Sequence, residues 1–134
     1  MSNINPYIKY QTSTLSPEEA IIKLHEKIFE RIEIIADNYE KLKVLPPEKF
    51  EDKKKILTDE IASQLDLIID SIDAIKNMID DNIDKKLKDN IYSVYNLFKV
   101  HLIKACYKED IDLIKDCKEI IMPLYESWKG KFSK

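Results

Sequence analysis

The strongest structural signal in this sequence is a run of apolar residues that recurs every three or four positions. The run consists of Ile61, Leu65, Ile68, Ile72, Ile75 and Ile79. This spacing puts apolar side chains on one face of a helix, whereas a half-buried strand would place them at every second position. Acidic residues, Asp66, Asp70 and Asp73, fall on the opposite side and are expected to face solvent. We therefore predict an amphipathic helix over residues 56–80.

Three further segments show the same periodicity and predict helices over residues 17–42, 85–106 and 110–129. Their apolar positions include Ile21, His25, Ile28, Ile32 and Ile35, then Ile91, Tyr95, Phe98 and Leu102, and finally Ile114, Cys117, Ile121 and Trp128. A chain of 134 residues is about the size of one domain. Four amphipathic helices with mostly short connections predict a single all-α domain over residues 1–134, an antiparallel up-down four-helix bundle.

Local signals suggest where these helices begin. Ser16 and Glu19 can form a reciprocal capping box, and Pro17 occupies the first helical position, where its missing N–H has no role. Asp110 is a suitable N-cap for the last helix. Residues 1–15 are polar but carry Pro6, Tyr7, Ile8 and Tyr10, so they are expected to form an extended arm.

Prolines and the glycine suggest where helices are interrupted. Pro46 and Pro47 precede a lysine run, so residues 43–55 are predicted to be a loop. Pro123 lacks a backbone donor and predicts a kink near residues 120–122. Gly130 follows the last periodic position and is expected to act as a C-cap.

Composition argues against several functional classes. The chain has one glycine, which leaves no material for a glycine-rich phosphate loop, and its basic residues include a single arginine, Arg31, at a net charge of −3. Nucleotide and nucleic-acid binding are therefore not expected. No segment is long and apolar enough to span a membrane, and the N-terminal residues lack a signal-peptide pattern. We expect a cytosolic protein with Cys106 and Cys117 reduced.

Residues with chemical potential do not assemble into a catalytic pattern. His25 and His101 belong to no metal-binding pair, and His25 lies on an apolar stripe, which predicts a partly buried, hydrogen-bonded histidine at one end of the bundle. Cys106 and Cys117 are predicted to be small core residues. The sequence therefore predicts no enzyme activity, no metal and no cofactor. Its seven tyrosines are more notable, because several could line a groove that a partner covers.

Three groups of residues together match a family pattern. The first is the opening Asn5-Pro6-Tyr7-x-x-Tyr10-Gln11, followed by Ser16-Pro17. The second is the apolar set Leu24, Ile28, Ile32 and Ala36, and the third is VYNLFKVHLIKAC over residues 94–106, followed by Asp110, Leu113 and Trp128. On these residues, and over nearly its whole length, the chain resembles the FliS family of flagellar secretion chaperones.

The resemblance implies a function and a set of contact residues. Members of that family are cytoplasmic bacterial proteins that hold the disordered C-terminal segment of flagellin and prevent premature polymerisation before export; components of the export apparatus are a further partner class. It implies no catalysis and no cofactor. The candidate partner-binding residues are Tyr7, Ile8, Tyr10, Leu24, Ile28, Tyr92 and Tyr95, with Tyr7, Ile8 and Tyr10 as a removable cover.

The sequence also departs from the family pattern and leaves two alternatives open. Leu24-His25-Glu26-Lys27 replaces the family's Leu-Tyr-Asp-Gly, and Cys106 replaces an asparagine. One alternative is therefore a bundle of the same fold that serves as a scaffold or regulator with a different protein partner. The other, a metal-dependent bundle enzyme, would require a stoichiometric metal ion, which we do not expect.

Overall fold

A computed structural model describes residues 16–79 and 83–132. The described elements are α2 (Pro17–Lys43), a short 3-10 helix η1 (Pro47–Lys49), α3 (Phe50–Met78), α4 (Lys85–Tyr107), α5 (Ile111–Asp116) and α6 (Lys118–Phe132). The described part of the chain contains helices and no strand. The predicted arm at residues 1–15 lies outside the described residues.

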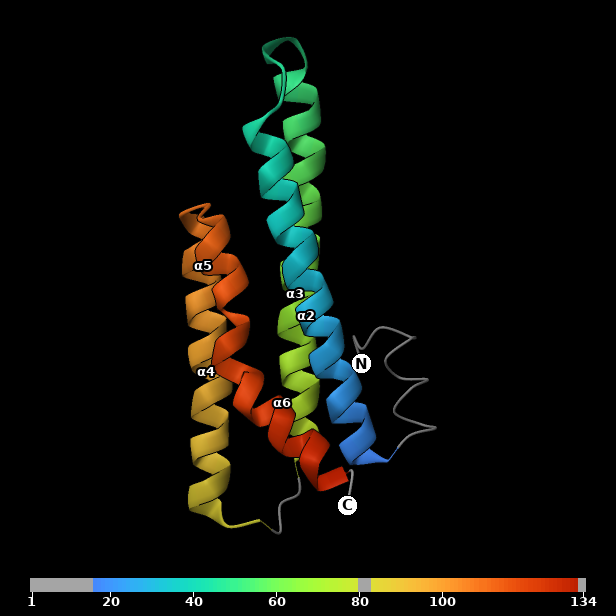
Figure 1. The fold of residues 1–134 in the computed structure, drawn as a ribbon, viewed down its shortest axis with the longest axis vertical. Helices are drawn as coiled ribbons and strands as arrows, with labels where there is room; N and C mark the ends of the chain where they lie inside the picture. The colour runs from blue at the N-terminus through green and yellow to red at the C-terminus, as the bar shows by residue number, and fades with distance from the viewer. Residues whose placement is uncertain (1–15, 80–82, 133–134) are drawn as a thin grey trace.

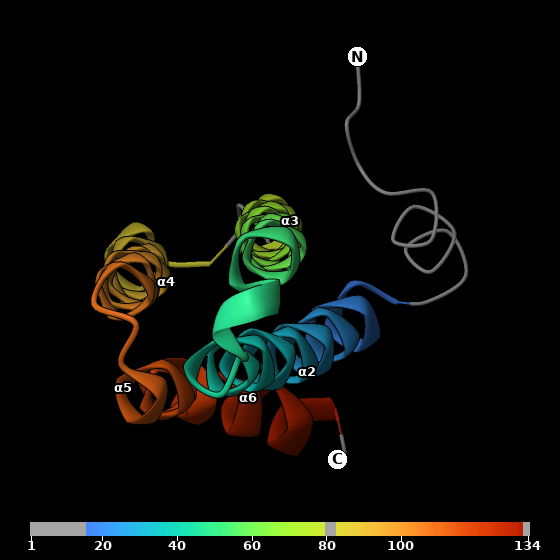
Figure 2. The same ribbon diagram turned by 90° about the horizontal axis from the view of Figure 1, so that it is seen from above.

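The helices form four antiparallel rods. Figure 1 shows α2 and α3 as a long hairpin, with α4 running beside it and α5 and α6 returning as the fourth rod. Seen from above, α2 lies between α3 and α6, and α4 completes the arrangement (Figure 2). This confirms the predicted all-α class and the up-down four-helix bundle.

Side-chain caps are present at three helix starts, and the caps at Ser16 and Asp110 were predicted from the sequence. The Glu19 N–H donates to Ser16 Oγ at 3.2 Å, and the Ser16 N–H donates to Glu19 Oε1 at 3.3 Å, which completes the capping box. Asp110 accepts from the N–H of Leu113 at 3.1 Å. Asp84 caps α4 in the same way, accepting from Leu87 at 3.1 Å. Each cap satisfies a backbone donor that the first helical turn leaves without a partner.

The prediction of a loop over residues 43–55 was wrong. Only residues 44–46 are non-helical there: η1 begins at Pro47, and α3 begins at Phe50, well before residue 56. Pro47 is compatible with a first helical position, and Glu51 and Asp52 favourably face the positive end of the helix dipole. Lysine also forms helices readily, so the lysine run continues the helix instead of interrupting it.

Predictions for the last helix were also partly wrong. The chain is interrupted at Cys117, upstream of residues 120–122, while Pro123 and Gly130 both lie inside α6. The Ile120 N–H donates to the carbonyl of Cys117, three residues earlier, at 3.1 Å, so the turn here is of the narrower 3-10 type. Pro123 lacks a backbone donor but is accommodated inside α6, six residues after the break. Gly130 has no positive φ and is not a C-cap.

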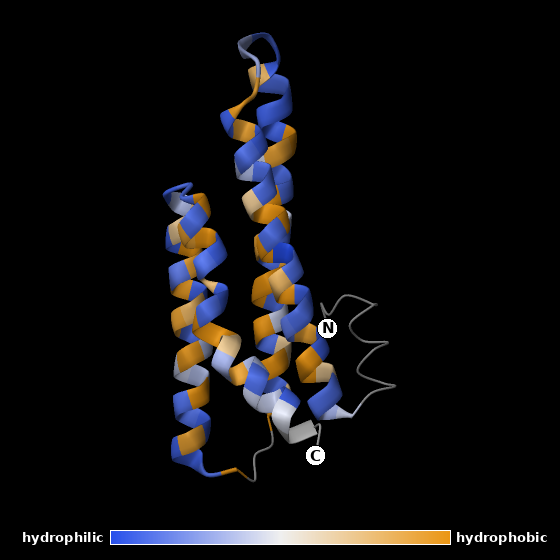
Figure 3. Cartoon of the chain, viewed as in Figure 1, coloured by the Kyte–Doolittle hydropathy of each residue, from blue (hydrophilic) through white to orange (hydrophobic). Residues whose placement is uncertain are grey.

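The predicted apolar stripes meet in one core. Ile28, Ile32, Ile68, Ile72 and Phe98 are fully buried and belong to the same cluster. Burial of a large apolar side chain stabilises a fold by roughly 1.5–3 kcal/mol. Hydrophobic residues accordingly recur at intervals along the helices (Figure 3), while Asp66, Asp70 and Asp73 are exposed, as predicted.

The boundary between α3 and α4 is held largely by polar groups. Lys76 Nζ donates to Asn96 Oδ1 at 2.7 Å, and the Tyr92 hydroxyl donates to the Lys76 carbonyl at 2.8 Å. Lys99 and Asp73 form an ion pair at 3.7 Å. Helix α4 packs more extensively against α5 and α6 than against α3. Among the described helices, one side of α4 therefore has no neighbour.

Candidate functional site

His25 is a structural residue in the core. Its side chain is fully buried, deeper than the partly buried position predicted at a bundle end. Nδ1 lies 2.8 Å from the Ile21 carbonyl, so it must donate, and Nε2 then accepts from the Tyr95 hydroxyl at 3.0 Å. Burial lowers the pKa of His25 to about 4. The imidazole is therefore neutral at pH 7 and joins α2 to α4.

Most of the predicted contact residues that the structure describes are in the core. Leu24 is 2% exposed, and Ile28 and Tyr95 have no exposed surface. Tyr92 is half-buried, and its hydroxyl donates a hydrogen bond to the Lys76 carbonyl. These four side chains do not line a common open groove, because the first three pack against other helices. Tyr7, Ile8 and Tyr10 lie outside the described residues.

The altered motif at residues 24–27 also has a packing role. The Tyr125 hydroxyl donates to Glu26 Oε2 at 2.8 Å, and the Tyr125 ring meets Phe29 edge-on, with centroids 5.1 Å apart. Burial, followed by the Glu26 carboxylate, raises the pKa of Tyr125 to about 12. His25 thus connects α2 to α4, and Glu26 connects α2 to α6. Because packing accounts for both residues, the departure from the family motif gives no separate support for a different partner.

The cysteines are free and buried. Burial raises the pKa of both Cys106 and Cys117 to about 11. A thiol with so high a pKa is a poor nucleophile at neutral pH. Within the described ranges, no group of three or more His, Cys, Asp or Glu side chains is placed to hold a metal ion.

The best candidate site is an exposed apolar row on the outer side of α4. It consists of Leu97, Val100, Ile103 and Tyr107, which are 51%, 50%, 46% and 90% exposed. We call this set the α4 stripe. Its members are spaced by three and four residues, so they share one helix face. Contiguous exposed apolar surface of this kind is typical of a protein-binding site.

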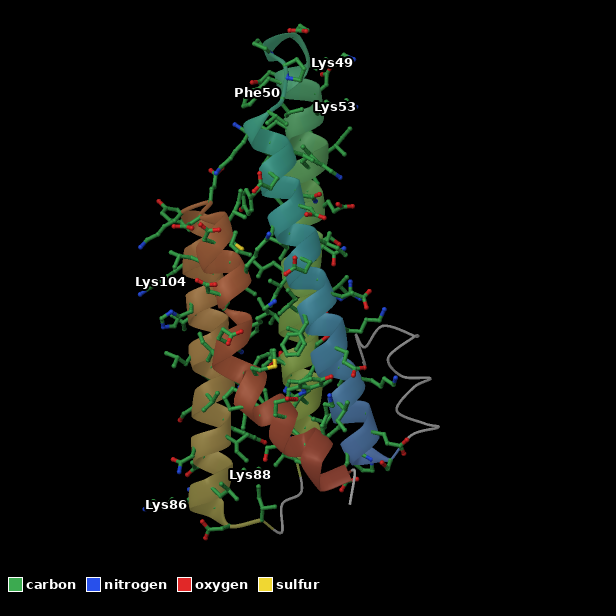
Figure 4. The ribbon with its side chains drawn as sticks, in the orientation of Figure 1. Lys49, Phe50, Lys53, Lys86, Lys88 and Lys104 are labelled. Atoms are coloured by element: carbon green, nitrogen blue, oxygen red, sulfur yellow. The ribbon has the colours of Figure 1, made fainter. Side chains whose placement is uncertain are left out.

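A cleft adjoins the α4 stripe. It has a volume of about 330 Å³ and lies where α4 faces α5 and the start of α6, with Leu113, Ala105 and Ile120 among its lining residues. Leu113 is 44% exposed. His101 and Lys104 also line it, and Lys104 projects from the outer side of α4 (Figure 4). The stripe and the cleft together give a partly apolar surface with basic groups at its edge.

The sequence contained a signal for the α4 stripe that our prediction did not use. Over residues 94–107, apolar residues occur on both sides of the helix, and we assigned only Tyr95, Phe98, Leu102 and their neighbours to a stripe. A helix that is apolar on two sides must either be surrounded by other helices or expose one side. The second side was therefore a candidate for partner binding.

Comparison with protein families matches residues 1–133 of the chain to the model described as flagellar protein FliS. Searches among curated proteins and among solved structures gave no match. Within the described residues, no helix has both the length and the apolar character needed to cross a membrane.

Proposed function

Because the chain belongs to the flagellar protein FliS family, a family of flagellar export chaperones, we propose that it binds the disordered C-terminal segment of flagellin in the bacterial cytoplasm and prevents polymerisation before export. The match across residues 1–133 is the observation that carries this proposal. No chemical step is required. Export-apparatus components are a second partner class in the same proposal.

The α4 stripe is the surface on which we place the client. A disordered segment that folds as an amphipathic helix can lay its apolar side along Leu97, Val100, Ile103 and Tyr107. The apolar area buried offsets the entropy lost when the segment becomes ordered. Leu24, Ile28 and Tyr95 contribute indirectly, because they hold α2 and α4 in place. Tyr92 lies at the α3–α4 boundary, where it can contact a client that extends past the stripe.

Calorimetric titration with a peptide from the C-terminus of the host's flagellin tests the proposal. Binding should be saturable, and its enthalpy should become more negative with rising temperature because apolar surface is removed from water. A flat titration at about tens of micromolar peptide would contradict the proposal. Pull-down from a lysate of the host separates it from the scaffold alternative, since flagellin should dominate the captured proteins only if the chain is a flagellin chaperone.

Removal of residues 1–12 is expected to tighten flagellin binding or leave it unchanged. We propose that Tyr7, Ile8 and Tyr10 cover apolar surface in the free protein, so a client must displace them, and their removal eliminates the free energy of that displacement. The measurement is the affinity for the same flagellin peptide with and without the deletion. A large loss of affinity would instead make these residues part of the binding site.

A further inference from the structure

The end of the α2–α3 hairpin carries a second surface, away from the α4 stripe. The hairpin extends well beyond α4 and α5 (Figure 1). Near its end lies a pocket of about 560 Å³, which we call the tip pocket. Its lining residues are Lys41, Val44, Leu45, Pro46, Lys49, Lys53, Ile56 and Leu57.

The apolar residues that line the tip pocket, which we call its floor, include two that are open to solvent. Val44 is 78% exposed and Ile56 is 66% exposed, although both are large apolar side chains. A hairpin connection does not require such residues, because polar side chains serve equally well in a solvent-exposed turn. Val44 and Ile56 come from opposite sides of the connection, so the turn brings two separate parts of the sequence to one pocket.

The charged residues that line the tip pocket are all lysines, which we call the rim lysines. Lys41, Lys49 and Lys53 line the pocket, and none of the acidic residues that the structure describes does. Lys49 and Lys53 both lie at the end of the hairpin (Figure 4). Neighbouring lysines have partners: Lys55 pairs with Asp59 at 2.9 Å, and Lys54 lies over the Phe50 ring at 5.1 Å. The three rim lysines, in contrast, form no ion pair with any residue that the structure describes.

From this combination we propose that the tip pocket binds an acidic segment of a second protein. One or two large apolar side chains of that segment enter between Val44 and Ile56, and the flanking carboxylates pair with Lys41, Lys49 and Lys53. The charge complementarity selects an acidic partner, while the apolar floor supplies buried area. Because the tip pocket and the α4 stripe lie on different helices, the chain can hold this partner and its client at the same time.

The local charges favour a protein over an anionic membrane surface as the occupant. Glu48, Glu51 and Asp52 are exposed at the same end of the hairpin, and they would be brought against lipid phosphates if the tip approached a bilayer. A protein segment can place its carboxylates opposite the lysines alone. The pocket volume also lies in the range of concave sites that receive ligands, roughly 300–1,000 Å³.

Synthetic peptides provide the test, with fluorescence anisotropy of the labelled peptide as the readout. The probe is a short peptide with a Leu-Phe pair flanked by glutamates, and its control has glutamines in place of the glutamates. The acidic peptide should bind the full chain saturably and more weakly as salt increases, whereas the glutamine peptide should bind at least about tenfold more weakly. Equal binding of both peptides, or no saturable binding up to about 1 mM, would overturn the proposal.

Matched variants locate the binding site. Lys49→Gln combined with Lys53→Gln should weaken binding of the acidic peptide about tenfold. Lys85→Gln combined with Lys86→Gln removes the same charge at the opposite end of the molecule, near which Lys86 lies (Figure 4), and should have little effect. Ile56→Ser should weaken binding by a similar factor, whereas Leu87→Ser should not, although Leu87 is also exposed. Equal losses in the control variants would overturn the assignment.

Two further measurements complete the test. Binding to phosphatidylglycerol-containing vesicles that is lost in the Lys49→Gln and Lys53→Gln variant would overturn the proposal in favour of a membrane surface. Titration of the same variants with the flagellin peptide should give unchanged affinity. If the acidic peptide binds as expected but the flagellin peptide does not bind, the proposed function is contradicted and the tip pocket is not. If the flagellin peptide binds but the acidic peptide does not, the tip pocket is contradicted and the proposed function is not.

Discussion

Replacement of Val100 and Ile103 by aspartate is expected to weaken flagellin-peptide binding by about a hundredfold or more. Both side chains lie in the middle of the α4 stripe and are about half exposed, at 50% and 46%. A client helix that covers them would have to bury two unpaired carboxylates against its own apolar side, which is strongly unfavourable. Losses of this size are typical of central residues in a protein interface. Isothermal titration calorimetry with the same peptide measures the effect.

Leu87→Asp is the matched control for this experiment. Leu87 is 51% exposed and lies on the same helix, but it is in the first turn, away from the α4 stripe. Its backbone N–H still donates to Asp84, because the substitution does not alter the main chain. The control should therefore retain flagellin binding. Circular dichroism should show native helicity in both proteins, and loss of binding in the control but not in the double variant would contradict our placement of the client.

Lowering the pH from 7 to 4 is expected to destabilise the protein by on the order of 3 kcal/mol through His25. Burial lowers the pKa of His25 from 6.5 to about 4 in the folded state. Between these values the unfolded chain binds a proton that the folded protein does not, so the free energy of unfolding falls as the pH decreases. Above pH 6.5 both states are neutral at this position, and the contribution is constant.

Urea unfolding at a series of pH values tests this expectation. In the native protein, His25 should contribute a slope of about 1.4 kcal/mol per pH unit between pH 4 and 6.5. His25→Gln should lose this contribution, whereas His101→Gln, at an exposed position on α4, should keep it. NMR titration of the His25 ring provides a second readout that needs no substitution. An apparent pKa near 6.5 in the folded protein would contradict the buried neutral state.

The role of His25 also shows that a residue within the segment that aligns with the family motif can stabilise the fold without contacting a client. Both of its ring nitrogens are hydrogen-bonded, Nδ1 to the Ile21 carbonyl and Nε2 to the Tyr95 hydroxyl. A substitution there should change stability first, and binding only through the position of α4. Reduced flagellin binding by a His25 variant should therefore be interpreted only together with its free energy of unfolding.

The sequence alone determined the helices and most of their buried faces. Apolar spacing depends only on the geometry of a single helix, which is why the buried positions of α2 and α3 and the caps at Ser16 and Asp110 were predicted correctly. The start of α3 and the break at Cys117 were less predictable. At both places prolines can either end a helix or be accommodated in one, and neighbouring residues decide between these outcomes.

The tertiary structure decided which apolar residues remain accessible. Helix α4 has apolar residues on two sides, and only the positions of α5, α6 and α3 determine that Tyr95 and Phe98 are buried while Val100 and Ile103 are exposed. The tip pocket likewise exists only because the turn brings Val44 and Ile56 together. Periodicity specifies the faces of one helix, but burial depends on what covers each face, and that is set by contacts between segments distant in the sequence.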